Sequence, residues 1–205
     1  MEDRFILDAC CSGRSFWFDK KHPNALYCDI RELEKGSIEK SPNFEIKPDK
    51  IVDFRNMPFP DRSFKLVVFD PPHLKSLEDN SWVKLKYGSL DPKTWKKYIL
   101  AGFNECWRVL EDYGTLIFKW SKSHDNRRRR DVSIENLLKV IPIKPLFGHP
   151  SGSKMNTIWF CFMKIPGQCT PIAVQSDPQN PGSIVQGAPC TPAGVQLPEE
   201  KSNDD

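Results

Sequence analysis

Short apolar runs alternate with polar stretches along the first 165 residues. Four of these runs stop at an acid: residues 5–7 at Asp8, 25–28 at Asp29, 50–52 at Asp53 and 64–69 at Asp70. Runs of this length, rich in Val, Ile, Leu and Phe, predict β-strands. The same reasoning predicts later strands over 115–118, 141–147 and 157–163.

Helical patterns lie between the strands. Apolar residues keep helical spacing from Trp95 to Leu110, with Asp91 as the predicted N-cap, Pro92 as the first helical residue and Gly114 as the stop. Residues 132–140 give a shorter amphipathic helix, and the charged residues 30–40 a weak one. Strand and helix in alternation predict an α/β sheet with helices on both faces.

The last two predicted strands are joined by a short connection. About nine residues are too few for a parallel crossover, so these two strands should pair antiparallel. The predicted fold class is therefore α/β, a mostly parallel sheet with an antiparallel C-terminal hairpin.

Residues 166–205 differ in composition from the rest. They hold seven prolines among Gly, Gln, Ser and Thr and keep no period of 2 or 3.6. We expect a folded domain over 1–165 and a flexible Pro-rich tail over 166–205. The tail has a net charge of −4. Because the whole chain has a net charge of +3, the domain has a net charge of +7. A basic domain favours an anionic partner, most commonly nucleic acid.

Composition excludes several classes of protein. With 39% hydrophobic residues, most of the chain is not disordered, and it has no apolar stretch of the roughly 18 residues that span a bilayer. Seven cysteines without a C-x-x-C pair indicate neither a disulfide framework nor a zinc site. We expect a cytoplasmic protein with reduced thiols, no secretory signal, no bound metal and no membrane partner.

The acids at successive strand ends predict a ligand site. In an open α/β sheet, ligands bind at the carboxyl ends of the strands. Asp29 ends the second strand, where dinucleotide folds bind the ribose hydroxyls. The first turn has Gly13 but no G-x-G-x-x-G, which disfavours NAD and favours a nucleoside cofactor without phosphates.

Two motifs carry a resemblance to a known family. The segment 8–13, Asp-Ala-Cys-Cys-Ser-Gly, resembles a variant first motif of the class I S-adenosylmethionine (SAM) methyltransferases. Asp70-Pro71-Pro72-His73 resembles the [DNS]-P-P-[YFW] motif of amino-group methyltransferases that act on adenine, cytosine or guanine. Together with 16–20 and 118–120, the pattern over about residues 4–164 is similar to small phage-type and bacterial enzymes.

The resemblance implies a Rossmann-like fold, SAM as cofactor and a set of site residues. The cofactor-binding residues that it implies are Asp8, Ala9, Cys10, Gly13, Asp29 and Asp53. The catalytic residues that it implies are Asp70, Pro71, Pro72 and His73. His73 stands where most relatives have a Tyr, Phe or Trp that stacks on the base. We expect no separate target-recognition domain, so residues 74–92 and 119–131 are the candidates for reading a target. The predicted substrate contacts are Lys119, Trp120, Arg127, Arg128, Arg129 and Arg130.

The chemistry explains these residue types. The lone pair of an exocyclic amine is delocalised into the ring, so the amine is a poor nucleophile. The carboxylate of Asp70 and the carbonyl of Pro71 can both accept its N–H groups and expose that lone pair, with the prolines holding the loop. The predicted function is SAM-dependent methylation of an exocyclic amine, and adenine N6 in DNA is the leading candidate for the acceptor. RNA, a protein amide or a small molecule as acceptor, or a non-catalytic nucleic-acid-binding module, remain alternatives, and the oligomeric state is open.

Overall fold

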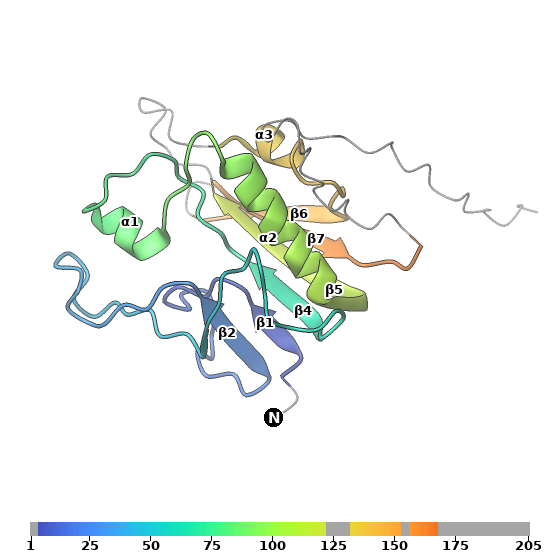
Figure 1. Cartoon of the computed structure of the whole chain (residues 1–205), viewed down its shortest axis with the longest axis horizontal. Helices are drawn as coiled ribbons and strands as arrows, with labels where there is room; N and C mark the ends of the chain where they lie inside the picture. The colour runs from blue at the N-terminus through green and yellow to red at the C-terminus, as the bar shows by residue number, and fades with distance from the viewer. Residues whose placement is uncertain (1–3, 122–131, 153–155, 168–205) are drawn as a thin grey trace, which may run out of the picture.

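The computed structural model describes residues 4–121, 132–152 and 156–167 (Figure 1). Seven strands form one sheet in the order β3-β2-β1-β4-β5-β7-β6. Their bounds are β1 Ile6–Asp8, β2 Ala25–Asp29, β3 Lys50–Ile51, β4 Phe64–Phe69, β5 Leu110–Ser121, β6 Phe147–Ser151 and β7 Thr157–Met163. Strands β1 to β5 pair in parallel, whereas β7 runs antiparallel to both β5 and β6. The predicted fold class, an α/β fold with a mostly parallel sheet and an antiparallel C-terminal pair of strands, is confirmed.

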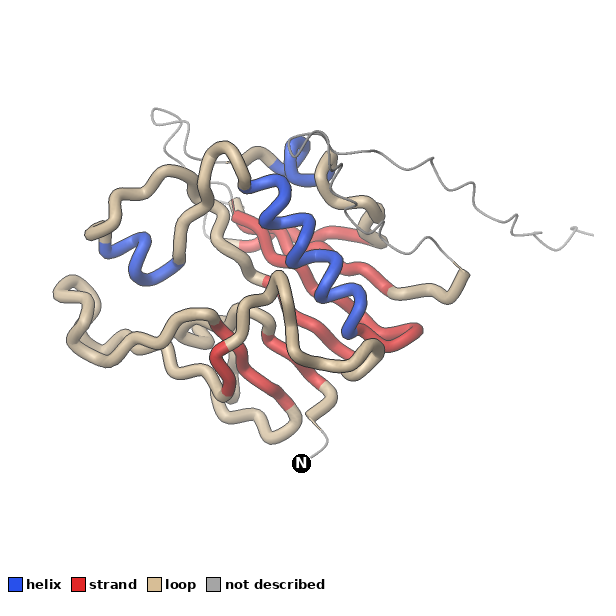
Figure 2. Tube along the Cα trace, viewed as in Figure 1, coloured by secondary structure: helices blue, strands red, loops and turns tan. Residues whose placement is uncertain are grey.

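The main core lies between the sheet and one long helix. The helices are α1 Trp82–Tyr87, α2 Trp95–Val109 and α3 Ile134–Leu138, and α2 crosses one face of the sheet (Figure 2). Its Phe103 is fully buried and meets the rings of Phe118 in β5 and Phe162 in β7. A Cβ atom added to Gly102 would lie 2.6 Å from Phe54 and 2.7 Å from Phe69. The glycine therefore lets α2 approach the sheet more closely than any other residue would.

The second face of the sheet is covered differently. In β5 the buried residues Leu116, Phe118 and Trp120 alternate with half-buried Ile117 and Lys119, as expected when one face is covered more completely than the other. On the second face a small cluster of Cys11, Ala25 and Tyr27 packs with Ile6 and Trp17. This cover comes from the β1–β2 loop, residues 9–24, so the prediction of helices on both faces is wrong for the described part of the chain.

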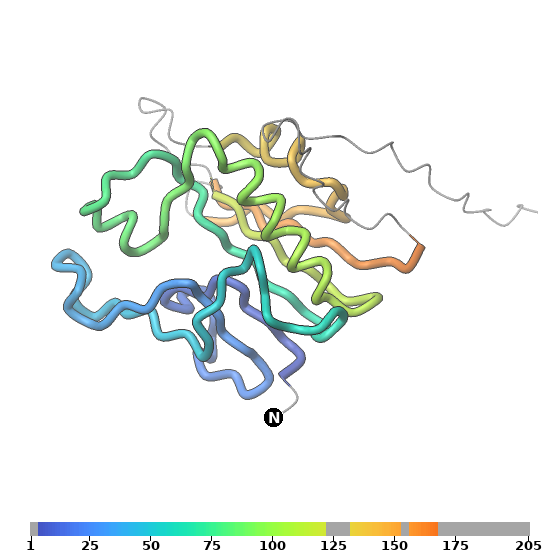
Figure 3. Tube along the Cα trace, in the orientation of Figure 1, coloured from blue at the N-terminus to red at the C-terminus, as the bar shows by residue number. Residues whose placement is uncertain are grey.

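Two local predictions also differ from the structure. Residues 30–40 form turns and a single bridge, Leu33 to Ile46, rather than a helix, because the segment has no apolar stripe to pack; it leads into the blue excursion beyond the sheet in Figure 3. The predicted strand over 141–147 is wrong, since β6 begins at Phe147 and runs through the expected turn, where His149 pairs with Trp159 of β7. An edge strand tolerates the proline at position 150.

The start and the end of α2 differ from the boundaries that the sequence predicts. The carboxylate of Asp91 accepts the backbone N–H groups of Lys93 and Thr94, so it caps the first turn as predicted, although the regular helix begins at Trp95. Gly114 does not stop the helix, because α2 passes directly into β5 and Gly114 lies inside that strand. A Cβ atom there would lie 2.8 Å from Leu110, which accounts for the glycine by packing.

Two sequence predictions fall outside the described residues. Arg127 to Arg130 lie there, as does the tail 166–205 apart from its first two residues. Among the described residues, no helix is both long and apolar enough to cross a membrane.

Candidate active site

A cavity of about 400 Å³ opens at the carboxyl ends of the parallel strands. We call it the strand-end cavity. Its size lies within the range of small-molecule sites, which combine apolar walls with a few polar groups. Its lining includes residues that follow each of the first four strands: Cys10 after β1, Asp29 to Leu33 at the end of β2, Phe54 after β3 and Pro72 after β4. Ile46, residues of the segment 79–89 around α1, and Tyr98 of α2 complete it.

Asp8 lies beneath this edge and is fully buried. The indole N–H of Trp17 donates to its Oδ2 at 2.7 Å, and the backbone N–H of Cys10 to its Oδ1 at 3.4 Å. Burial raises the pKa of Asp8 to about 7, with the Trp17 hydrogen bond opposing the shift. The indole donor is a partner that sequence reasoning missed, because it depends on how the β1–β2 loop folds back.

The buried carboxyl of Asp8 predicts a pH-dependent stability. Its folded-state pKa of about 7, against an ordinary 3.8, means that the folded protein holds a proton which the unfolded chain has released. The stabilisation from this proton is complete below about pH 4 and is lost as the pH rises through about 7. Between pH 5 and 8 the free energy of unfolding therefore falls by about 2–3 kcal/mol. We expect the free energy of unfolding of the wild type to fall by that amount relative to Asp8→Asn, whose side chain does not titrate. Urea unfolding at a series of pH values measures it, and a constant difference between the two proteins would contradict it.

Asp29 is buried and fully hydrogen-bonded. Its Oδ1 accepts from the backbone N–H and Nε of Arg31 at 3.0 and 2.9 Å, and its Oδ2 from Nη2 of Arg31 and the N–H of Ser12 at 3.0 and 2.9 Å. A carboxylate has about four acceptor directions, so all are occupied. Arg31 also donates to the carbonyl of Leu85 at 3.3 Å, which ties α1 to the mouth of the cavity.

Asp53 repeats this arrangement after β3. Its carboxylate accepts the backbone N–H and Nε of Arg55, both at 2.9 Å, and Nη2 at 2.5 Å. These hydrogen bonds lower the pKa of Asp53. The guanidinium lies 4.7 Å from the ring centre of Tyr98, which lines the cavity. The shared Asp-x-Arg spacing was the visible sequence signal for both arginine partners.

Asp70 and Lys119 form an ion pair at the ends of β4 and β5. Lys119 Nζ lies 2.5 Å from Asp70 Oδ2, and each side chain is 21% exposed, so the pair is reachable from outside. Burial raises the pKa of Asp70, and the ammonium of Lys119 opposes this shift. The ammonium also lies 5.4 Å from the ring of Phe16 and 5.5 Å from that of Trp159. These two rings flank the pair, and sequence reasoning had not assigned a site role to Trp159.

The cysteine beside Asp70 is a neutral packing group. Cys10 Sγ accepts the backbone N–H of Asp70 at 3.2 Å, and burial raises the pKa of this thiol well above its ordinary value. A buried protonated thiol is a poor nucleophile, so Cys10 shapes the site and does not react.

His73 faces the core side of the same edge. Its ring lies 6.2 Å from that of Trp120 in an edge-on arrangement. Burial, together with the charge of Lys119, lowers the pKa of His73 to about 4, so the imidazole is neutral at pH 7. Trp120 is fully buried and donates its indole N–H to the carbonyl of Val132 at 3.0 Å. The structure thus places Trp120 in the core, where it supports His73 and presents no surface to a substrate.

The remaining predicted residues lie at different distances from the cavity. Pro72 lines it, while Pro71 is buried beside Asp70. Ala9 is buried and donates its N–H to the carbonyl of Val68, and Gly13 packs against the ring of Phe44 and lines another cavity. Neither residue lines the strand-end cavity. In the described ranges no three His, Cys, Asp or Glu side chains gather as a metal site would require.

Comparison with known proteins adds weak structural likenesses. No family model matches the chain, and no curated protein does. Among solved structures it is similar to the PH0226 protein from Pyrococcus horikoshii OT3, at 14% identity, with 78% of this chain and 81% of that one covered and a TM-score of 0.48. It is similar to the N-methyltransferase NodS from Bradyrhizobium japonicum WM9, at 12% identity, 78% and 85% coverage and a TM-score of 0.47. A SAM-dependent methyltransferase from Methanosarcina mazei aligns at 11% identity, 78% and 92% coverage and 0.44. Likenesses below a TM-score of 0.5 transfer no activity to this chain.

Proposed function

We propose that this chain is a SAM-dependent methyltransferase that methylates an exocyclic amino group, and that adenine N6 in DNA is its acceptor. One observation carries the proposal. An Asp70-Pro71-Pro72 turn ends β4 with its carboxylate partly exposed, while Pro72 lines a cavity of cofactor size at the same edge. An acceptor and a methyl donor bound on either side of this turn would be neighbours.

The strand-end cavity fits the nucleoside part of SAM. Its apolar walls, Leu33, Ile46, Phe54 and Tyr98, suit a flat base. Asp29 would accept the ribose hydroxyls, and Arg31 would release at least one of its hydrogen bonds so that a hydroxyl can take its place. Bound SAM supplies an electrophilic methyl group on a sulfonium.

The chain's own groups would orient the acceptor. The carboxylate of Asp70 and the carbonyl of Pro71 accept the N–H groups of the amine, which frees the nitrogen lone pair for in-line attack. Lys119 favours the ionised form of Asp70, the form that accepts hydrogen bonds. Phe16 and Trp159, which flank this pair, offer aromatic surface for a planar acceptor.

Charge supports nucleic acid as the carrier of that acceptor. The +7 on residues 1–165 favours a polyanionic substrate. A base in a duplex must leave the stack to reach Asp70, so single-stranded and mismatched DNA should be the better substrates.

The test is methyl transfer from labelled SAM. Unmethylated DNA, RNA and a protein extract are each incubated with the enzyme, and the nucleic acids are digested to nucleosides and identified by mass. We expect label in N6-methyladenine from DNA. Label only in RNA, protein or small amines would overturn the DNA acceptor. SAM binding undetectable by calorimetry would overturn the enzyme and favour a nucleic-acid-binding module on this fold.

A further inference from the structure

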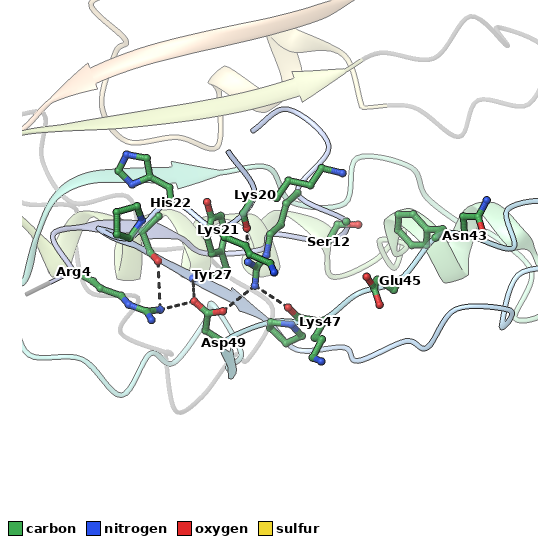
Figure 4. A pocket seen from close by; sticks show the side chains of 16 residues that line it. Arg4, Ser12, Lys20, Lys21, His22, Tyr27, Asn43, Glu45, Lys47 and Asp49 are labelled. Carbon is green, nitrogen blue, oxygen red and sulfur yellow. Dashed lines mark hydrogen bonds and ion pairs between the residues drawn. The ribbon is translucent and has the colours of Figure 1, made fainter. Parts of the chain in front are cut away.

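A second cavity, of about 590 Å³, lies along β2, with Ala25 and Tyr27 of that strand in its lining (Figure 4). It shares no lining residue with the strand-end cavity. Five basic side chains and two acidic ones line it, with Tyr27 as part of its wall. We call it the basic groove and define it by Arg4, Arg14, Lys20, Lys21, Lys47, Glu45 and Asp49.

The two arginines form a fixed floor. Arg4 and Arg14 both pair with Asp49, at 2.5 and 2.9 Å. The guanidinium of Arg14 lies 3.8 Å from the centre of the Tyr27 ring and donates to the carbonyls of Lys20 and Lys47 at 2.6 and 2.8 Å. Arg14 therefore holds the backbone of two lysines at the groove, while it shares the carboxylate of Asp49 with Arg4.

Three lysines lie around this floor. Lys20, Lys21 and Lys47 are exposed, and none forms an ion pair with a described residue. The other acid of the groove, Glu45, lies 3.6 Å from Lys35. Three unpaired ammonium groups around one concave surface favour an anionic ligand.

The β1–β2 loop connects this groove to the proposed acceptor site. Phe16 in the loop packs beside the Asp70–Lys119 pair, and Lys20 and Lys21 of the same loop line the groove. Phe18, between them, is fully exposed. Lysines that follow a groove, with an exposed aromatic ring nearby, are the combination that binds single-stranded nucleic acid by its phosphates and bases.

The groove is elongated. In Figure 4, Arg4 and His22 lie toward one end and Asn43 toward the other, with the lysines spread between them. This arrangement suits successive phosphates of a strand better than one enclosed phosphate.

We propose that the basic groove binds the phosphodiester backbone of the nucleic-acid substrate, with Lys20, Lys21 and Lys47 contacting phosphates beside the target base. The proposal rests on the proposed function for the substrate class, and it names a binding surface separate from the Asp70-Pro71-Pro72 turn and the strand-end cavity. Phosphate contacts position a strand without reading its sequence, so the groove would add affinity and not target preference.

The test replaces the three lysines together with glutamine and measures binding of a fluorescent single-stranded DNA 20-mer by anisotropy over a series of salt concentrations. Each lost phosphate contact lowers the salt slope by about 0.7 for a single strand, so we expect a slope smaller by about 2 and affinity weaker by up to roughly 100-fold at 0.1 M salt. The matched control carries Lys96→Gln, Lys139→Gln and Lys144→Gln, three exposed lysines outside the groove. It should keep a slope closer to that of the wild type.

The outcomes separate this proposal from the proposed function. Equal slopes for the two triple variants would overturn the groove, whatever the methyl-transfer result. Inorganic phosphate or a mononucleotide competing as well as the 20-mer would show a site for a small phosphate and would also overturn it. A changed slope with unchanged SAM binding by calorimetry supports the groove even if DNA carries no label in the transfer assay. Circular dichroism of both variants checks that they are folded.

Discussion

Asp70→Asn should lower the rate of methyl transfer by about 10²–10³-fold while SAM affinity changes less than about threefold. The amide keeps the shape of the side chain but removes the charge and one acceptor oxygen, and losing one preorganised group that stabilises a transition state has an effect of this size. Asp70 does not line the strand-end cavity, so cofactor binding should survive. Single-turnover transfer of labelled methyl and calorimetry with SAM measure the two quantities.

Asp61→Asn is the matched control for this substitution. Asp61 is also paired with a cation, Arg108 at 2.8 Å, but it precedes β4 at the opposite end of that strand. Its variant should transfer methyl groups at a rate close to that of the wild type. Full activity in Asp70→Asn would exclude this carboxylate from catalysis. Loss of SAM binding in that variant would instead make Asp70 a structural residue.

Phe103→Ala should lower the free energy of unfolding by about 3–5 kcal/mol, the usual result of removing a large buried aromatic side chain. Phe103 is fully buried and its ring meets Trp107, Phe118 and Phe162, so the cavity left behind lies between α2 and the sheet. For a domain of this size we expect the melting temperature to fall by roughly 6–20 °C. Urea unfolding and thermal melts followed by circular dichroism measure both effects.

Phe18→Ala provides the comparison, since this phenylalanine is fully exposed. Its removal should change the free energy of unfolding by no more than about 0.5 kcal/mol. If the two variants were equally stable, the packing of α2 on the sheet would not be the main core of the domain.

Much of the sheet could be predicted because its signals are local. Strand β4 occupies the predicted residues 64–69, and β7 the predicted 157–163. A buried strand needs a short apolar run, and the run is visible in the sequence wherever the strand lies in the fold. The strand over 141–147 failed because β6 is an exposed edge strand, whose place depends on pairing with β7 rather than on its own apolar residues.

Part of the site could have been predicted more closely. Lys119 and Trp120 are neighbours in β5. The side chain of Lys119 contacts Asp70, whereas that of Trp120 is buried in the core. Successive strand side chains point to opposite faces, so alternation alone says that the two could not both face one substrate. The Asp-x-Arg repeat at 29–31 and 53–55 was similarly readable as two local ion pairs.

The α/β class, the antiparallel last pair of strands and the acids at the strand ends could be predicted from the sequence, because each depends on residues close together along the chain. The contacts between distant side chains depend on the folded arrangement: Trp17 with Asp8, Lys119 with Asp70, and Arg4 with Asp49. The basic groove likewise draws its lysines from two separate segments beside β2. Strand register and the folding back of the β1–β2 loop bring these distant residues together, and no local periodicity records that packing.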